Sequence, residues 1–129
     1  MTDLKLTLSC LSDILAICRL EADAPLPTWA DGGDFTSITR TGDELSVVCR
    51  SRDVPAGIRC EKGYRCLKVE GPLDFALTGI LSSLATVLAR EDISVFPVST
   101  FDTDYILVKE GQMEKAVQAL SQAGHILRR

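Results

Sequence analysis

The sequence has no long apolar run and no excess of basic residues. No run of apolar residues approaches the roughly 18 needed to span a membrane, and the N-terminus lacks the basic and apolar regions of a secretory signal. Eighteen acidic residues against fourteen basic ones give a formal net charge of −4, which does not favour nucleic-acid phosphates. These absences predict a cytoplasmic protein with no membrane partner and no nucleic-acid partner.

Motifs that would identify a catalytic or metal site are also missing. The sequence has no HExxH, GxSxG or CxxC pattern and neither phosphate-binding glycine pattern, GxGxxG or GxxxxGK. Its single histidine, His125, follows Gly124 at the end of an expected helix, where the helix dipole favours a cation. We therefore interpret His125 as a helix-end residue, and we expect no enzyme activity, no metal ion and no cofactor.

The five cysteines form an odd set without paired spacing. Four of them have an aliphatic residue beside them or one position away, which is typical of small buried side chains. Buried, reduced thiols therefore fit this pattern better than disulfide or metal chemistry does.

Two amphipathic helices are predicted in the second half of the chain. Apolar residues recur at three- and four-residue steps over 77–88, which is the spacing of one buried helical face. Asp74 or Thr78 could cap this helix, and the sequence does not decide between them. A second apolar face covers 113–120, and Gly124 is placed to end that helix.

Short segments rich in β-branched and aromatic residues predict strands between and before these helices. Their expected ranges are 4–9, 14–21, 35–40, 44–49, 64–69, 93–99, 104–109 and 125–127. The hairpin over 35–49 matches 95–109 after a shift of sixty positions, which suggests a degenerate internal duplication. Mixed βαβ units with antiparallel hairpins predict an α+β sandwich that has its helices on one face.

Two segments differ from ordinary core or surface. Residues 70–80 form a strand-to-helix junction with two glycines, where free backbone N–H groups attract a carboxylate. Gly79 within a helical pattern suggests close approach of backbone or ligand, and a plain tight turn is an equal alternative. The turn 99–105 combines hydroxyls, two carboxylates and Phe101. An aromatic residue in so polar a turn favours binding over a merely solvated turn.

These two segments resemble the ACT domain family. The runs GPLDFALTGIL at 71–81 and STFDTDYILVK at 99–109 are similar to ACT modules of bacterial stand-alone proteins and of CASTOR-type arginine sensors. The resemblance covers 64–127 well and 4–60 more weakly. It implies tandem ferredoxin-like βαββαβ halves with an antiparallel sheet, a degenerate first half at 1–60 and an ACT domain at 61–129.

The resemblance also implies a function. ACT domains are non-catalytic regulatory modules that bind free amino acids where two such domains pair, so it implies a homodimer and an unidentified regulated enzyme or protein. An acidic wall at the site favours a cationic amino acid such as arginine or lysine. The ligand contacts implied in this way are Asp74, Phe75, Leu77, Thr78, Gly79, Ile80, Ser99, Thr100, Phe101, Asp102 and Asp104.

Two other classes of function compete with an amino-acid sensor. The chain could be a protein-interaction or scaffold module that binds a partner through a sheet edge and has no small-molecule ligand. A small enzyme that uses Cys66 or His125 is the least favoured reading, because no catalytic motif surrounds either residue.

Overall fold

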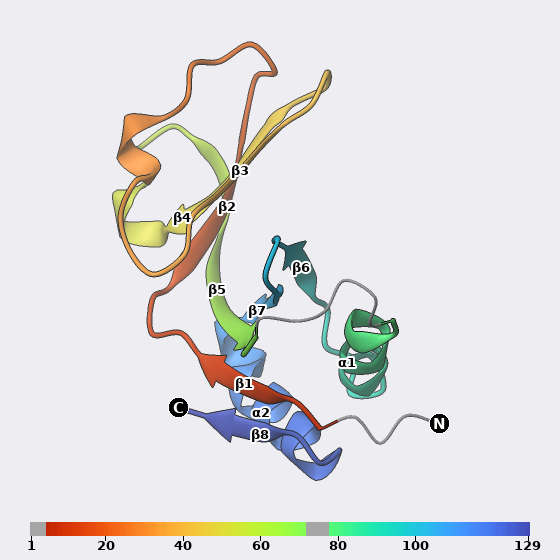
Figure 1. Ribbon diagram of the computed structural model, residues 1–129. Helices are drawn as coiled ribbons and strands as arrows, with labels where there is room; N and C mark the ends of the chain where they lie inside the picture. Colours follow the sequence, from red (N-terminus) through yellow and green to blue (C-terminus); the bar gives the residue numbers. More distant parts are fainter. Residues whose placement is uncertain (1–4, 72–77) are drawn as a thin grey trace. The chain divides into compact units, whose positions relative to one another are not determined.

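The computed structural model describes residues 5–71 and 78–129, and the chain divides into two compact units (Figure 1). The N-terminal unit is Ser12–Tyr64, and the C-terminal unit combines Met1–Leu11 with Arg65–Arg129. Strand β5 (Arg59–Val69) begins in the first unit and ends in the second. The N-terminal unit is therefore inserted between the first strand of the C-terminal unit and the rest of that unit.

The C-terminal unit has the βαββαβ order of a ferredoxin-like fold, which confirms the predicted fold class. From β5 onward its elements are α1 (Ile80–Ala89), β6 (Phe96–Ser99), β7 (Asp104–Lys109), α2 (Met113–Gln122) and β8 (Ile126–Arg128). Strand β1 (Thr7–Cys10) is the added strand that the sequence predicted, and it lies between β5 and β8. It pairs antiparallel with β5 and parallel with β8, so the sheet is not entirely antiparallel.

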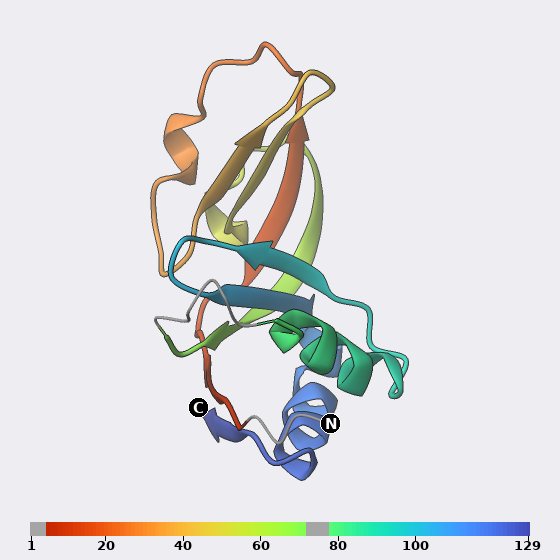
Figure 2. The same ribbon diagram turned by 45° about the vertical axis from the view of Figure 1, so that its right-hand side comes forward.

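Alternating side chains of the strands pack with both helices in one core, and Figure 2 shows the backbone of these strands and helices. Leu67 and Val69 of β5 share a core with Ile106 and Val108 of β7, in keeping with the two-residue period of a strand. The helices contribute to the same core and pack against each other. Neither α1 nor α2, the helices of the described residues, is long and apolar enough to cross a membrane.

Helix α1 begins three residues later than the apolar pattern predicted. Its N-cap is Gly79, with φ 78°, and no side chain caps the helix, so Thr78 is not the cap. The other candidate cap, Asp74, lies outside the described residues. A Cβ on Gly79 would meet no described atom within 4 Å, so no described backbone approaches it closely, and close approach of a ligand stays a prediction. The positive φ, which L side chains rarely adopt, explains the glycine.

Helix α2 ends as predicted, but His125 does not behave as a helix-end cation. Gly124 follows the helix with φ 103°, and His125 is buried. The His125 Nδ1 accepts the backbone N–H of Leu6 at 3.1 Å, which only a ring unprotonated at Nδ1 can do. Burial lowers the pKa of His125. The imidazole is thus a neutral acceptor that ties the segment before β1 to the segment before β8.

This arrangement predicts a loss of stability in mild acid. Because the folded-state pKa of His125 lies below its ordinary value, its contribution is complete above about pH 6.5 and is lost as the pH falls toward the folded-state pKa. Urea denaturation between pH 8 and 5 measures this loss. His125→Asn retains a side-chain acceptor without a titrating ring, so this variant should lose less stability than the wild type over that range. An equal loss would contradict the role given to His125.

The N-terminal unit, Ser12–Tyr64, is smaller and consists of strands and 3-10 turns without an α-helix. Its strand order is β3 (Ser37–Arg40), β4 (Leu45–Arg50), β2 (Leu15–Leu20), and then β5. A single 3-10 turn, Thr28–Ala30, stands where the other unit has α1, as the sequence indicated. Its core joins one face of β2 and β4 to Ala30 of that turn.

The two units share a repeated hairpin. A shift of 59 positions takes β3 onto β6 and β4 onto β7, and the pairing Ser37↔Val48 becomes Phe96↔Leu107. The same shift takes the 3-10 turn Ser51–Asp53 onto Glu110–Gln112. The offset is one less than the sixty positions suggested by the sequence. This correspondence favours an internal duplication, and the origin of residues 1–60 as a degenerate ACT-like half stays a prediction.

Candidate functional site

The strand-to-helix junction predicted as one wall of a ligand site is described only in part. Asp74, Phe75 and Leu77 lie outside the described residues. Thr78 and Gly79 are exposed immediately before α1, and the Ile80 side chain is buried in the core. Because no side chain caps α1, the backbone N–H groups of its first turn are suited to donate hydrogen bonds to an anion.

The other predicted wall is the turn between β6 and β7. The N–H of Thr100 donates to the Thr103 carbonyl at 2.8 Å, and Ser99 Oγ donates to Asp104 Oδ1 at 2.5 Å. The Thr103 hydroxyl is buried and donates to the Val69 carbonyl of β5 at 2.5 Å. The turn is therefore anchored to the sheet of the same unit. Sequence reasoning passed over Thr103, although a hydroxyl beside two acidic residues was the available signal.

This anchored turn directs an aromatic ring and two carboxylates toward its surface. Phe101 is 80% exposed, Asp102 is exposed, and Asp104 is half-buried beside Ser99. The structure thus brings Ser99 and Asp104 into contact. A cleft that joins this turn to residues 74–80 stays a prediction.

Two of the cysteines are weak nucleophiles because they are buried. All five are free thiols, and burial raises the pKa of Cys18 and of Cys66 to about 12. Such groups remain protonated at neutral pH and react slowly. Among residues 5–71 and 78–129, no group of three or more His, Cys, Asp or Glu side chains could hold a metal ion.

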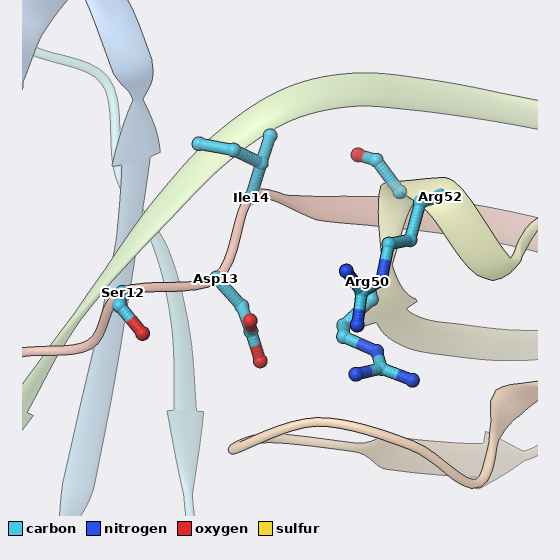
Figure 3. A pocket seen from close by; sticks show the side chains of 6 residues that line it. Ser12, Asp13, Ile14, Arg50 and Arg52 are labelled. Carbon is cyan, nitrogen blue, oxygen red and sulfur yellow. The ribbon is translucent and has the colours of Figure 1, made fainter.

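A pocket that the sequence did not predict lies within the N-terminal unit (Figure 3). It has a volume of about 320 Å³ and is lined by Ser12, Asp13, Ile14, Arg50, Ser51 and Arg52. In Figure 3, Asp13 projects from the segment before β2, Arg50 from the last residue of β4, and Arg52 from the 3-10 turn that follows it. Two sequence features could have indicated this pocket: the glycine pair within Asp31–Asp34 and the charged segment Arg50–Asp53. They lie far apart along the chain, so the sequence alone did not connect them.

Family models match the two parts of the chain separately. A model described as an ACT domain matches residues 59–122, which include β5, α1, β6, β7 and α2. A second model, of an N-terminal domain, matches residues 13–57. The comparison with curated proteins finds no match.

Solved structures share the fold over nearly the whole chain. A crystal structure of a protein from Agobacterium tumefaciens has 44% identity and a TM-score of 0.90, covering 96% of this chain and 92% of that one. A Vibrio cholerae protein of unknown function, a possible transport protein, has 18% identity and a TM-score of 0.76, with 92% and 90% covered. The regulatory subunit of aspartate kinase from Thermus thermophilus has 12% identity and a TM-score of 0.64, with 95% and 99% covered.

Proposed function

Because the chain belongs to the ACT domain family, we propose that it is a non-enzymatic regulatory module that binds a free amino acid. The match includes both helices and the strands around them, and a structural neighbour is the regulatory subunit of an aspartate kinase. The observation that carries the proposal is the anchored turn beside Asp104. This turn carries the Asp104 carboxylate beside the Ser99 hydroxyl, and it lies in the unit that matches the ACT domain model.

The proposed ligand is cationic, with arginine or lysine favoured. Asp104 is half-buried and Asp102 is exposed on the same turn, so both can face a bound cation. Charge-assisted hydrogen bonds between such a carboxylate and an ammonium or guanidinium group are stronger than neutral ones. The uncapped first turn of α1 is the proposed seat of the ligand's own carboxylate.

The proposed site is completed by pairing of ACT domains in a homodimer. Residues 74–80 and 99–104 supply its two walls, and the ligand bridges domains that pair through their sheets or helices. A ligand with higher affinity for one quaternary arrangement shifts the population toward it, and this shift would regulate a partner enzyme or protein. Native mass spectrometry of freshly purified protein measures the oligomer mass and any amino acid that co-purifies.

Replacing Asp104 with asparagine is expected to weaken binding of the cationic amino acid about tenfold or more. Asparagine keeps an acceptor oxygen but loses the negative charge, and a hydrogen bond to a charged group contributes about 1.5–3 kcal/mol against about 1 kcal/mol for a neutral one. Isothermal titration calorimetry of the full chain with the twenty amino acids identifies the ligand and measures the loss. Asp92→Asn is the matched control, because Asp92 is exposed in the same unit and its positive φ also suits asparagine.

The result that contradicts the proposal is equally definite. No heat with any of the twenty amino acids, together with no change in melting temperature, would favour a protein-interaction module without a small-molecule ligand. Equal weakening by Asp104→Asn and Asp92→Asn would move the ligand away from the turn.

A further inference from the structure

The pocket of the N-terminal unit is formed by backbone that the fold holds in place. One wall is the segment Ser12–Ile14, and the other runs from Arg50 to Arg52. The N–H of Ser51 donates to the Ile14 carbonyl at 2.8 Å, and β2 pairs with β4 immediately beside it. A volume of about 320 Å³ lies at the small end of the range typical of ligand pockets.

The charged side chains of the pocket differ in how many of their hydrogen-bonding groups are already used within the protein. Arg50 Nε donates to Asp53 Oδ2 at 2.8 Å, and the Asp53 hydrogen bond raises the pKa of Arg50. Arg52 is exposed and forms no ion pair with any residue in 5–71 or 78–129. Across the pocket, Asp13 Oδ2 accepts the N–H of Asp34 at 2.9 Å, and a carboxylate retains capacity for further donors. Arg52 and Asp13 are therefore the groups suited to bind a ligand.

The glycine pair Gly32 and Gly33 packs against the side chains of Arg50 and Asp13. A Cβ on Gly32 would overlap the guanidinium of Arg50, and a Cβ on Gly33 would lie 2.6 Å from Asp13 Oδ2. Gly33 also has φ +87°. The arginine and the aspartate thus pack against glycine backbone, and at Gly33 a larger residue would have to displace them and adopt a strained positive φ.

One residue that lines the pocket, Ser51, has a buried hydroxyl beside the pocket that is unsatisfied by any described residue. Ser51 Oγ is buried and has no hydrogen-bond partner within the described part of the chain, although Ser51 lines the pocket. Buried polar groups in native proteins nearly always have a partner, so an exception requires an explanation. A ligand oxygen in the pocket would satisfy this hydroxyl after a rotation about its side-chain bond.

We propose that this pocket binds a small zwitterion, a molecule with one carboxylate and one cationic nitrogen such as a small neutral amino acid. The ligand carboxylate binds Arg52 and Ser51, and its cationic nitrogen binds Asp13. An anion alone would be repelled by the carboxylates of Asp13, Asp34 and Asp53, and a cation alone by the two arginines. Ile14 provides an apolar contact that suits a short side chain.

This site is independent of the proposed function described above. Its residues all lie in Ser12–Tyr64, outside the ACT match of residues 59–122. Its ligand differs too, because the small volume and mixed charge suit a small neutral zwitterion rather than a long cationic side chain.

Nuclear magnetic resonance of the ¹⁵N-labelled full chain tests the proposal. Glycine, L-alanine and L-serine are titrated to about 10 mM, a range that detects dissociation constants near 1 mM. Acetate and methylamine serve as probes with one charged group each. We expect saturable amide shifts at Asp13, Ile14, Ser51 and Arg52 with the zwitterions and weaker shifts with either single-charge probe.

Two variants of the full chain assign the binding to the pocket. Arg52→Gln should weaken the zwitterion at least tenfold, and Arg59→Gln, a change at another exposed arginine of the same unit, should leave binding unchanged. Asp104→Asn should also leave it unchanged. The proposal is overturned by an absence of saturable shifts, by acetate that binds as well as glycine, or by an Arg52→Gln variant that binds like the wild type. If a cationic amino acid binds and only Asp104→Asn abolishes its binding, that result supports the proposed function and not this second site.

Discussion

Replacing Leu84 with alanine should lower the free energy of unfolding by about 3 kcal/mol. Leu84 has no exposed surface and lies in the core that joins α1 and α2 to the strands of the C-terminal unit. The substitution removes buried apolar atoms and leaves a cavity, and α1 has only ten residues, too few for stability without packing. Urea denaturation followed by circular dichroism measures the loss.

Leu81→Ala is the matched control for this prediction. Leu81 lies on the same helix but is only partly buried against the same core, so its loss should be nearer 1 kcal/mol. Both variants make the same chemical change within one helix, and helix propensity therefore cancels in the comparison. Similar losses for the two variants would mean that Leu84 does not lie at the centre of the core.

Replacing Gly33 with alanine should cost about 2 kcal/mol of stability. Two effects contribute, because Gly33 has φ +87° and because its new Cβ would lie 2.6 Å from Asp13 Oδ2 and from Arg50 Cγ. The same substitution displaces the two charged side chains at the unpredicted pocket. Urea denaturation measures the loss, and the zwitterion titration shows whether binding is lost as well.

Gly57→Ala separates the two effects of this substitution. Gly57 has φ +89°, nearly the same backbone conformation, but a Cβ there would meet no described atom within 4 Å. Its loss should therefore reflect conformational strain alone, about 1 kcal/mol. A Gly33→Ala loss no greater than that of Gly57→Ala would indicate that packing against Asp13 and Arg50 contributes nothing.

Local sequence patterns predicted the elements whose stability depends on their own residues. The strand at 104–109 and the helix that starts at Met113 occur where periodicity and β-branched residues indicated. The predicted start of α1 was wrong. The apolar repeat begins at Leu77, but the helix begins at Ile80, immediately after Gly79 with its positive φ. A hydrophobic pattern identifies the buried face of a helix, but it does not identify the residue at which the helix begins.

Features formed by distant segments were not accessible to the same reasoning. The hydrogen bond that His125 accepts comes from Leu6, which is 119 positions away in the chain. The pocket joins residues 12–14 to residues 50–52, and each segment alone resembles an ordinary polar loop. The turn at 99–104 was identified because its unusual residues are adjacent in the sequence, whereas its anchor, the Thr103 bond to Val69, required the fold.

In the C-terminal unit, the residues that flank the inserted N-terminal unit are hydrogen-bonded to each other. The N–H of Leu11 donates to the Cys66 carbonyl at 2.9 Å, and the Arg65 guanidinium donates to the Leu11 carbonyl. Strands β1 and β5 are already antiparallel neighbours at this point, so a short reverse turn could connect them directly. The β1–β5 pairing lies within the C-terminal unit on both sides of the insertion, so a change in the length of the inserted segment would leave that strand pair intact.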